Sequence, residues 1–142
     1  MSEAEKTQLA VIGAGPGGYA AAFLAADLGM DVTLIDPEVN PGGVCLYRGC
    51  IPSKALLHVA KLLAETEDAE HWGIKFSKPQ IDLDTLRDWK NSVVTKLTGG
   101  LGQLTKQRKI RSIQGRAVFL DARTLEISDP GGGKQKLVFE NA

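Results

Sequence analysis

The sequence lacks an excess of positive charge, a long apolar run and an apolar leader. Each absence argues against one class of protein. Lysine plus arginine and aspartate plus glutamate both number 17, so a nucleic-acid-binding or membrane-surface protein is not expected. No apolar run approaches the roughly 18 residues that a membrane span requires. The first residues are polar and acidic, which argues against a secretory signal. These features predict a cytoplasmic globular protein.

Cysteine and histidine are also scarce, with two of each in 142 residues. Two cysteines are too few for a disulfide-stapled miniprotein, and with two histidines they are too few for a structural zinc site, so we expect no metal. The length suits one domain better than two. Glycine, by contrast, occurs 16 times, and its positions are informative.

The first 36 residues predict a β–α–β unit. Residues 9–12 form a short apolar run with the length and β-branched content of a buried strand. Residues 16–28 are rich in alanine, the best helix former, and residues 32–35 have the composition of a second strand. Strand, helix and strand within 30 residues are typical of a right-handed crossover between parallel strands.

The rest of the chain predicts a loop, two helices and several strands. We expect residues 40–50 to be a loop, a helix from Pro52 to about residue 64, and irregular structure over 66–80. Leucines and valine between 83 and 104 recur at helical spacing, and Gly99, Gly100 and Gly102 inside that helix indicate a close contact or a kink. Apolar runs at 110–113, 117–120, 125–127 and 137–139 predict a small antiparallel meander. Two parallel strands and a meander make an incomplete fold, so we expect a piece of a longer protein.

A glycine-rich loop follows the first predicted strand. Gly13, Gly15 and Gly18 match G-x-G-x-x-G, in which the glycines permit a tight turn, a close approach to a pyrophosphate and close packing of helix on strand. Asp36 ends the second strand, where an acidic side chain accepts hydrogen bonds from an adenosine ribose. The pattern predicts a dinucleotide site, for either a flavin or a nicotinamide. The alternative is a glycine-rich turn followed by a surface aspartate.

Cys45 and Cys50 lie in the most specific stretch of the sequence. In a regular helix, residues five apart have Cα atoms roughly 8–9 Å apart, whereas a disulfide needs about 4.4–6.8 Å. A bond between the two cysteines therefore needs a distorted backbone, for which Gly49 is suited, and such a small strained ring is easily reduced. A redox pair, two inert buried thiols and half of a metal site remain alternatives.

The residues around Cys50 are suited to a reactive thiol. Because Cys50 precedes Pro52, we expect it at a helix N-terminus, whose positive end stabilises a thiolate. Lys54 is four residues on and shares the same helical face, so its charge can support the thiolate or an electron-rich ring. The other candidate side chains have ordinary interpretations: His58 on a helix face or in packing, His71 and Trp72 at the surface or in a satellite core, and Trp89 in packing or at an interface.

Together, these motifs resemble the N-terminal part of the flavin-dependent pyridine-nucleotide disulfide oxidoreductases. The resemblance rests on the glycine loop, on Asp36 and on the segment Gly42-Gly43-x-Cys45-x4-Cys50-Ile51-Pro52-Ser53-Lys54, and it covers essentially the whole chain. Residues 51–58 are most similar to the family members that oxidise dihydrolipoyl groups. Leu46-Tyr47-Arg48 departs from the Leu-Asn-Val that is commoner between the cysteines.

The resemblance implies a fold and a cofactor. The fold is α/β, a Rossmann-like FAD-binding domain with a parallel sheet, helices and a small antiparallel meander. It would be incomplete here, since residues 1–142 would form its N-terminal part and the NAD-binding and C-terminal interface domains would be absent. The FAD-binding residues that the resemblance implies are Gly13, Gly15, Pro16, Gly17, Gly18, Asp36, Pro37, Gly42, Gly43, Val44, Cys45, Cys50, Lys54 and, through its backbone, Ala117.

The resemblance also implies a reaction. Cys45 would be the interchange thiol that meets the substrate sulfur, Cys50 the charge-transfer thiol beside the flavin, and Lys54 would lie near the flavin. Electrons would pass from a protein-bound dihydrolipoyl group through a Cys45–Cys50 redox disulfide and FAD to NAD. Expected partners are the lipoyl domains of 2-oxo-acid dehydrogenase or glycine cleavage complexes, and the full-length protein is expected to be a homodimer.

We expect the 142 residues alone to be inactive, because the acid–base group and the nicotinamide site would lie elsewhere. Three alternatives remain. The chain could be a non-catalytic flavin- or nucleotide-binding module, or part of a related reductase of the glutathione or mercuric type. It could also be an interaction fragment in which an exposed helix face with Val93, Val94 and Leu97 meets a missing partner.

Overall fold

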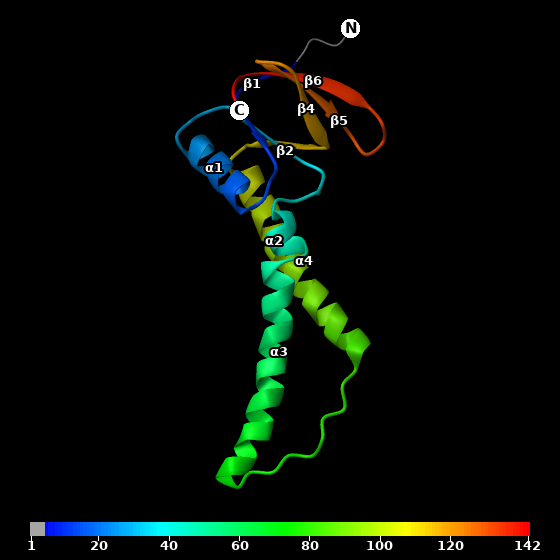
Figure 1. Ribbon diagram of the computed structural model, residues 1–142. Coiled ribbons are helices and arrows are strands. Elements are labelled where there is room, and N and C mark those ends of the chain that lie inside the picture. The colour runs from blue at the N-terminus through cyan, green and yellow to red at the C-terminus, as the bar shows by residue number, and fades with distance from the viewer. Residues whose placement is uncertain (1–4) are drawn as a thin grey trace. The chain divides into compact units, whose positions relative to one another are not determined.

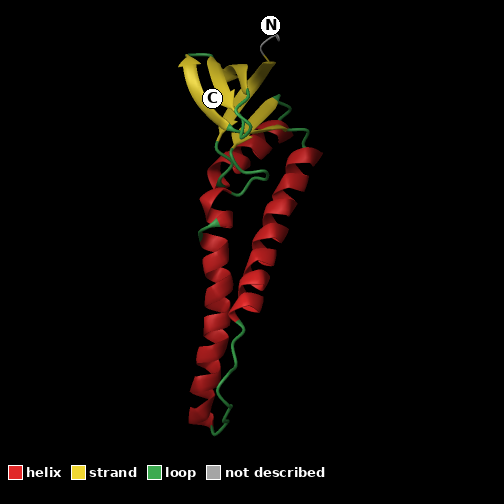
Figure 2. Ribbon diagram, turned by 90° about the vertical axis from the view of Figure 1, so that its right-hand side faces the viewer, coloured by secondary structure: helices red, strands yellow, loops and turns green. Residues whose placement is uncertain are grey.

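The computed structural model describes residues 5–142, which form two compact units. The first unit contains the residues up to Gly43 together with Thr98–Ala142, and the second is Val44–Leu97. All the strands belong to the first unit, where they form one sheet (Figures 1 and 2). The second unit is built mainly from helices.

The sheet has six strands in the order β3-β2-β1-β6-β5-β4. The strands are β1 (Glu5–Ile12), β2 (Val32–Asp36), β3 (Arg111–Gln114), β4 (Arg116–Asp121), β5 (Thr124–Ser128) and β6 (Lys134–Asn141). Four of them, β3, β2, β1 and β6, are parallel neighbours, and β5 and β4 continue the sheet as an antiparallel meander. The α/β fold with a parallel sheet, helices and a meander is therefore confirmed.

Helix α1 (Pro16–Asp27) connects β1 to β2, so the predicted β–α–β unit is confirmed. The assignment of residues 110–113 to the meander is wrong. Strand β3 instead pairs in parallel with β2, with Ile113 opposite Ile35. Strand β6 is the third strand of the meander and also pairs in parallel with β1. Apolar runs show that these segments are strands, but they do not show which neighbour each strand pairs with.

The core of the first unit consists of two apolar clusters. Val32 and Leu34 of β2 pack in one cluster with Ala22 of α1, whereas Ile35 packs in the other cluster with side chains of β5 and β6. Because successive side chains of a strand point to opposite faces, β2 is buried on both sides. Each such leucine or isoleucine contributes about 1.5–3 kcal/mol by leaving water.

The remaining helices are longer than the sequence pattern indicates. They are α2 (Gly43–Tyr47), α3 (Cys50–Asp68), a short 3-10 helix (Ala69–Trp72) and α4 (Leu83–Gln107). The expected loop over 40–50 thus contains α2, and the expected irregular segment over 66–80 is helical as far as Trp72. Polar residues such as Glu65 and Glu67 weaken the apolar periodicity, but glutamate is a good helix former, so the helix continues. None of the described helices is long and apolar enough to cross a membrane.

The second unit buries few apolar side chains. Within Val44–Leu97 the buried apolar residues are Leu46, Ala55 and Ala69. Trp72 is 76% exposed, so its placement in a satellite core is wrong, whereas His58 and His71 are exposed on the helices as expected. Trp89 is 40% exposed and lines an apolar groove with Leu86. Of the helix face expected to be exposed, only Leu97 is; Val93 and Val94 are half-buried.

Candidate functional site

The glycine loop connects β1 to α1 in a conformation that needs its glycines. Gly13 has a φ of +95°, a backbone angle that favours glycine, and its N–H donates to the Ile35 carbonyl at 2.8 Å. A Cβ at Gly18 would overlap the Gly13 carbonyl. Gly18 therefore lets α1 pack directly on the end of β1, as the motif predicts.

The first turn of α1 is free to receive an anion. Gly15 is the N-cap residue, no side chain among the described residues caps the helix, Pro16 opens the helix and the first turn holds no acidic residue. A Cβ at Gly17 would meet no described heavy atom within 4 Å apart from its chain neighbours and the helix backbone, so the backbone is open there. The unpaired N–H groups and the positive dipole end of a helix bind phosphate groups. A pyrophosphate therefore fits this turn.

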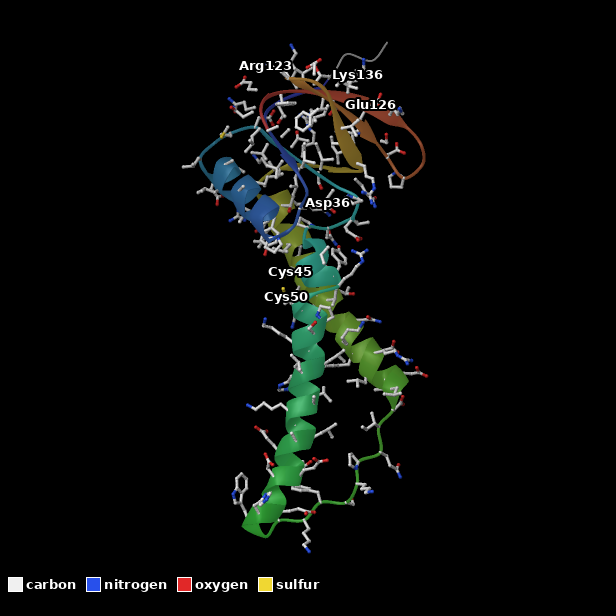
Figure 3. All side chains as sticks on the ribbon, in the orientation of Figure 1. Asp36, Cys45, Cys50, Arg123, Glu126 and Lys136 are labelled. Atoms are coloured by element: carbon white, nitrogen blue, oxygen red, sulfur yellow. The ribbon has the colours of Figure 1, made fainter. Side chains whose placement is uncertain are left out.

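Asp36 ties the end of β2 to the glycine loop (Figure 3). Its Oδ2 accepts the Ala14 N–H at 2.7 Å, and its Oδ1 accepts the Glu38 N–H at 2.8 Å. A carboxylate offers about four acceptor positions, so both oxygens keep capacity for further donors such as ribose hydroxyls. Ala14, which the sequence analysis missed, is buried and central to this arrangement because its carbonyl also accepts the Gly42 N–H at 2.8 Å.

The second glycine pair packs against the first loop. Gly43 has a φ of +57°, and a Cβ there would lie 2.5 Å from the Cα of Gly15. Only glycine, which has no Cβ, can lie this close to Gly15. The structure therefore brings Gly13, Gly15, Asp36, Gly42 and Gly43 together, and we call these five residues the glycine cradle.

Three of the other predicted cofactor residues have different surroundings. Pro37 is exposed, and its carbonyl accepts the Gln114 Nε2 at 2.9 Å. Val44 is 69% exposed at the start of the second unit. Ala117 on β4 packs its side chain against a core cluster, which leaves only its backbone for a ligand. Their roles toward a cofactor stay predictions.

The two cysteines lie on either side of a break between helices in the second unit. Helix α2 ends at Tyr47 and α3 begins at Cys50, so Cys50 is at a helix N-terminus as predicted. Gly49 is the N-cap residue, with φ −122° and ψ −108°. A Cβ at Gly49 would lie 3.0 Å from the Val44 carbonyl and 3.4 Å from the Cα of Cys45. Gly49 therefore packs closely on Val44 and Cys45 at the break between the two helices.

Both cysteines are free thiols in the structure, and they interact (Figure 3). A hydrogen bond with the Cys50 side chain, helped by desolvation and by the charge of Cys50, raises the pKa of Cys45. The Cys50 backbone amide and the Lys54 charge act in the opposite direction on the same pKa. Cys45 is half-buried and Cys50 is exposed, which disagrees with the alternative of two inert buried thiols.

One alternative for the cysteines is half of a metal site. Residues 5–142 contain no group of three or more histidine, cysteine, aspartate or glutamate side chains that could hold a metal ion. His58 and His71, the candidate partners of the cysteines, are exposed, and the His71 Nδ1 lies 3.1 Å from the Asp68 carbonyl oxygen. The arrangement is that of an interacting dithiol.

The features of the cradle and the dithiol define a class of protein. Residues 7–142 match the family model described as pyridine nucleotide-disulphide oxidoreductase, and the chain belongs to this family. The resemblance drawn from the motifs is therefore confirmed.

Within the family, the chain is similar to dihydrolipoyl dehydrogenases. It is 50% identical to that of Haemophilus influenzae and 47% identical to that of Vibrio cholerae, over all of this chain and 30% of each relative. It is 45% identical to that of Geobacillus stearothermophilus, over 96% of this chain and 29% of the relative. The chain thus spans about 30% of the length of these curated relatives, at their N-terminal end.

Proposed function

We propose that this chain is the N-terminal FAD-binding part of a flavoprotein that oxidises protein-bound dihydrolipoyl groups with NAD as acceptor. The observation that carries the proposal is the packing of Gly43 on Gly15, which joins two glycine loops beside Asp36 and the open turn of α1. The similarity to dihydrolipoyl dehydrogenases supports the choice of a flavin and of a dithiol substrate.

Different residues in and next to the glycine cradle would bind different parts of the cofactor. The amides of the first turn of α1 would hold the pyrophosphate, and the Asp36 carboxylate would accept the ribose hydroxyls. Gly43 would keep the second loop close to the first, so that the backbone excludes water from one side of the pyrophosphate. When bound, FAD would supply a two-electron acceptor.

The cysteine pair would exchange its disulfide with the substrate. One substrate thiolate would attack the Cys45 sulfur, the Cys45–Cys50 bond would break and Cys50 would leave as a thiolate. The second substrate thiol would then attack the substrate sulfur of the mixed disulfide and release Cys45. The substrate dithiol loses two electrons and two protons, and the cysteine pair gains them. The Lys54 charge lowers the pKa of Cys45, against the larger raising effect of the Cys50 side chain.

The NAD site, the lipoyl-domain partners, the homodimer and the cytoplasmic location belong to this proposal as predictions. So does the inactivity of the 142-residue chain, since a positioned proton-transfer group alone is worth roughly 10²–10⁴ in rate. NAD-linked turnover of lipoamide by the purified chain would contradict that prediction.

Two measurements test the proposed function. Addition of the chain to FAD should quench flavin fluorescence, and Gly43→Val, which places a side chain against Gly15, should weaken that effect, whereas Gly99→Ala should not. Mild oxidation should remove two hydrogen atoms from the chain and link Cys45 to Cys50 in the peptide map, with Cys45→Ser as the control.

The outcomes separate the alternatives. FAD binding without a Cys45–Cys50 bond would indicate a non-catalytic flavin module. No quenching at a large molar excess of the chain would contradict the proposed function.

A further inference from the structure

Helix α4 contains three glycines close together, and one of them has a packing partner in another segment. A Cβ at Gly99 or Gly100 would meet no described heavy atom within 4 Å outside the helix backbone. Gly102 is buried, and a Cβ there would overlap the Oδ1 of Asn40 and lie 2.9 Å from its Cγ. Glycine weakens a helix relative to alanine, so glycine at 102 needs a reason, and the Asn40 side chain supplies it.

Asn40 lies in the loop that carries the second glycine pair into the cradle. Two hydrogen bonds hold the start of this loop. The Glu38 N–H donates to Asp36, and the Gln114 side chain donates to the Pro37 carbonyl. Its end is tied by the Gly42 N–H to the Ala14 carbonyl. Asn40 lies between these two ends, so the space that α4 leaves for its side chain affects the path of residues 37–42.

We propose that Gly102 is a positioning residue for the glycine cradle and that it acts through Asn40. By leaving room for the Asn40 side chain, Gly102 lets the loop follow the path on which Gly43 contacts Gly15. A side chain at 102 would displace Asn40 and move Gly43 away from Gly15. The proposal rests on the proposed function for its effect on FAD, but the contact itself belongs to the ligand-free chain.

The first test compares two alanine substitutions in the same helix of the 142-residue chain. Gly102→Ala should raise the dissociation constant for FAD by at least about tenfold, as measured by flavin fluorescence. Gly100→Ala is the matched control, because it adds the same methyl group where no described side chain lies, and it should leave the constant within about twofold. Equal affinity of the two variants would overturn the proposal.

The second test is a rescue. Asn40→Ala removes the atoms that a side chain at 102 would displace, so the Asn40→Ala/Gly102→Ala double variant should bind FAD more tightly than Gly102→Ala alone. Contacting residues show such coupling, whereas independent residues have additive effects. A double variant whose loss equals the product of the two single losses would overturn the proposal.

The third test needs no cofactor. Hydrogen exchange of the Gly42 amide, which bonds to Ala14, should become faster in Gly102→Ala than in Gly100→Ala. The Ile110 amide, which bonds to Thr105 at the end of α4, is the reference and should change equally in both variants. Faster exchange only at Ile110 would indicate a damaged helix end and would overturn the proposal.

These readouts distinguish the two proposals. A parent chain that does not bind FAD contradicts the proposed function, while exchange at Gly42 still decides whether Gly102 positions the loop. A parent chain that binds FAD as tightly as Gly102→Ala contradicts the positioning role alone. If Gly102→Ala does not fold, the Asn40→Ala/Gly102→Ala double variant is compared with Asn40→Ala, because the overlap is absent in both. The two should bind FAD with equal affinity, and weaker binding by the double variant would overturn the role.

Discussion

Two buried threonines on neighbouring strands differ in what their hydroxyl groups contact. Thr7 of β1 donates to the Asp31 carbonyl at 3.0 Å and lies 3.3 Å from the Leu9 carbonyl. Thr33 of β2 is fully buried, and its hydroxyl oxygen has no hydrogen-bond partner among the described residues. A buried polar group without a partner costs more than an apolar group of the same shape.

Valine substitutions should therefore have opposite effects at these two positions. Thr33→Val should raise the free energy of unfolding by about 1 kcal/mol, because it replaces an unpaired hydroxyl with a methyl group of similar size. Thr7→Val should lower it by about 1 kcal/mol, because it removes a hydrogen bond. Urea unfolding of both variants measures the difference, and a loss of stability in both would contradict the prediction.

The pKa of Cys45 gives a second prediction at the residue scale. The Cys50 side chain raises this pKa, so Cys50→Ala should lower it and increase the thiolate fraction at neutral pH. Iodoacetamide should then alkylate Cys45 faster, and the midpoint of the rate profile should move to lower pH. Lys54→Met should move the midpoint the other way, because the lysine charge lowers the pKa. Lys61→Met, further along α3, is the control, and an unchanged midpoint in Cys50→Ala would contradict the assignment.

At the scale of an element, α4 begins with a side-chain cap that the apolar periodicity did not indicate. The Oδ1 of Asp82 accepts the N–H groups of Asp84 and Thr85, and its Oδ2 accepts the Thr85 hydroxyl. These bonds, led by that of the Thr85 amide, lower the pKa of Asp82. An aspartate at this position stabilises a helix by pairing amides that the helix leaves unbonded.

Removal of this cap should have a pH-dependent effect. Because the pKa of Asp82 is lowered in the folded chain, its stabilising effect is present above the ordinary carboxyl range and is lost as the pH falls through the folded pKa. Asp82→Ala should lower the melting temperature at pH 7, and the difference from the parent chain should shrink in acid. Asp88→Ala, within the same helix, is the control. A difference that does not depend on pH would contradict the capping role.

At the scale of the whole molecule, the two units differ in how much apolar surface they bury. The first unit has two apolar clusters on a six-stranded sheet, whereas Val44–Leu97 leaves Leu57, Trp72, Phe76 and other large side chains exposed. Residues 73–82 of the second unit have no regular secondary structure and are exposed. Segments with few buried contacts open at low cost in free energy.

Limited proteolysis should show this difference. Trypsin should cut first after Lys75, in the exposed segment, and should leave the sheet of the first unit intact at that stage. Lys78 precedes Pro79 and is a poor site for trypsin. Mass spectrometry of the early products identifies the cut, and Lys75→Gln should delay it. A first cut inside the sheet would contradict the prediction.

Local sequence information is enough for some elements of this fold and not for others. The β–α–β unit, the glycine loop and the start of α3 at Cys50 follow from neighbouring residues, through propensity, turn geometry and spacing. The end of α3 and the presence of α2 were missed, because polar helix formers leave no apolar periodicity to detect.

The sequence by itself determined that a glycine-rich loop between a strand and a helix and a closely spaced cysteine pair are present, since each depends on residues within a few positions of one another. Only the tertiary structure decided that β3 and β6 extend the parallel sheet, that Asp36 bonds to Ala14, and that Gly102 leaves room for Asn40. These pairs are far apart along the chain. Their contacts depend on how the strands and helices pack, which no short segment specifies.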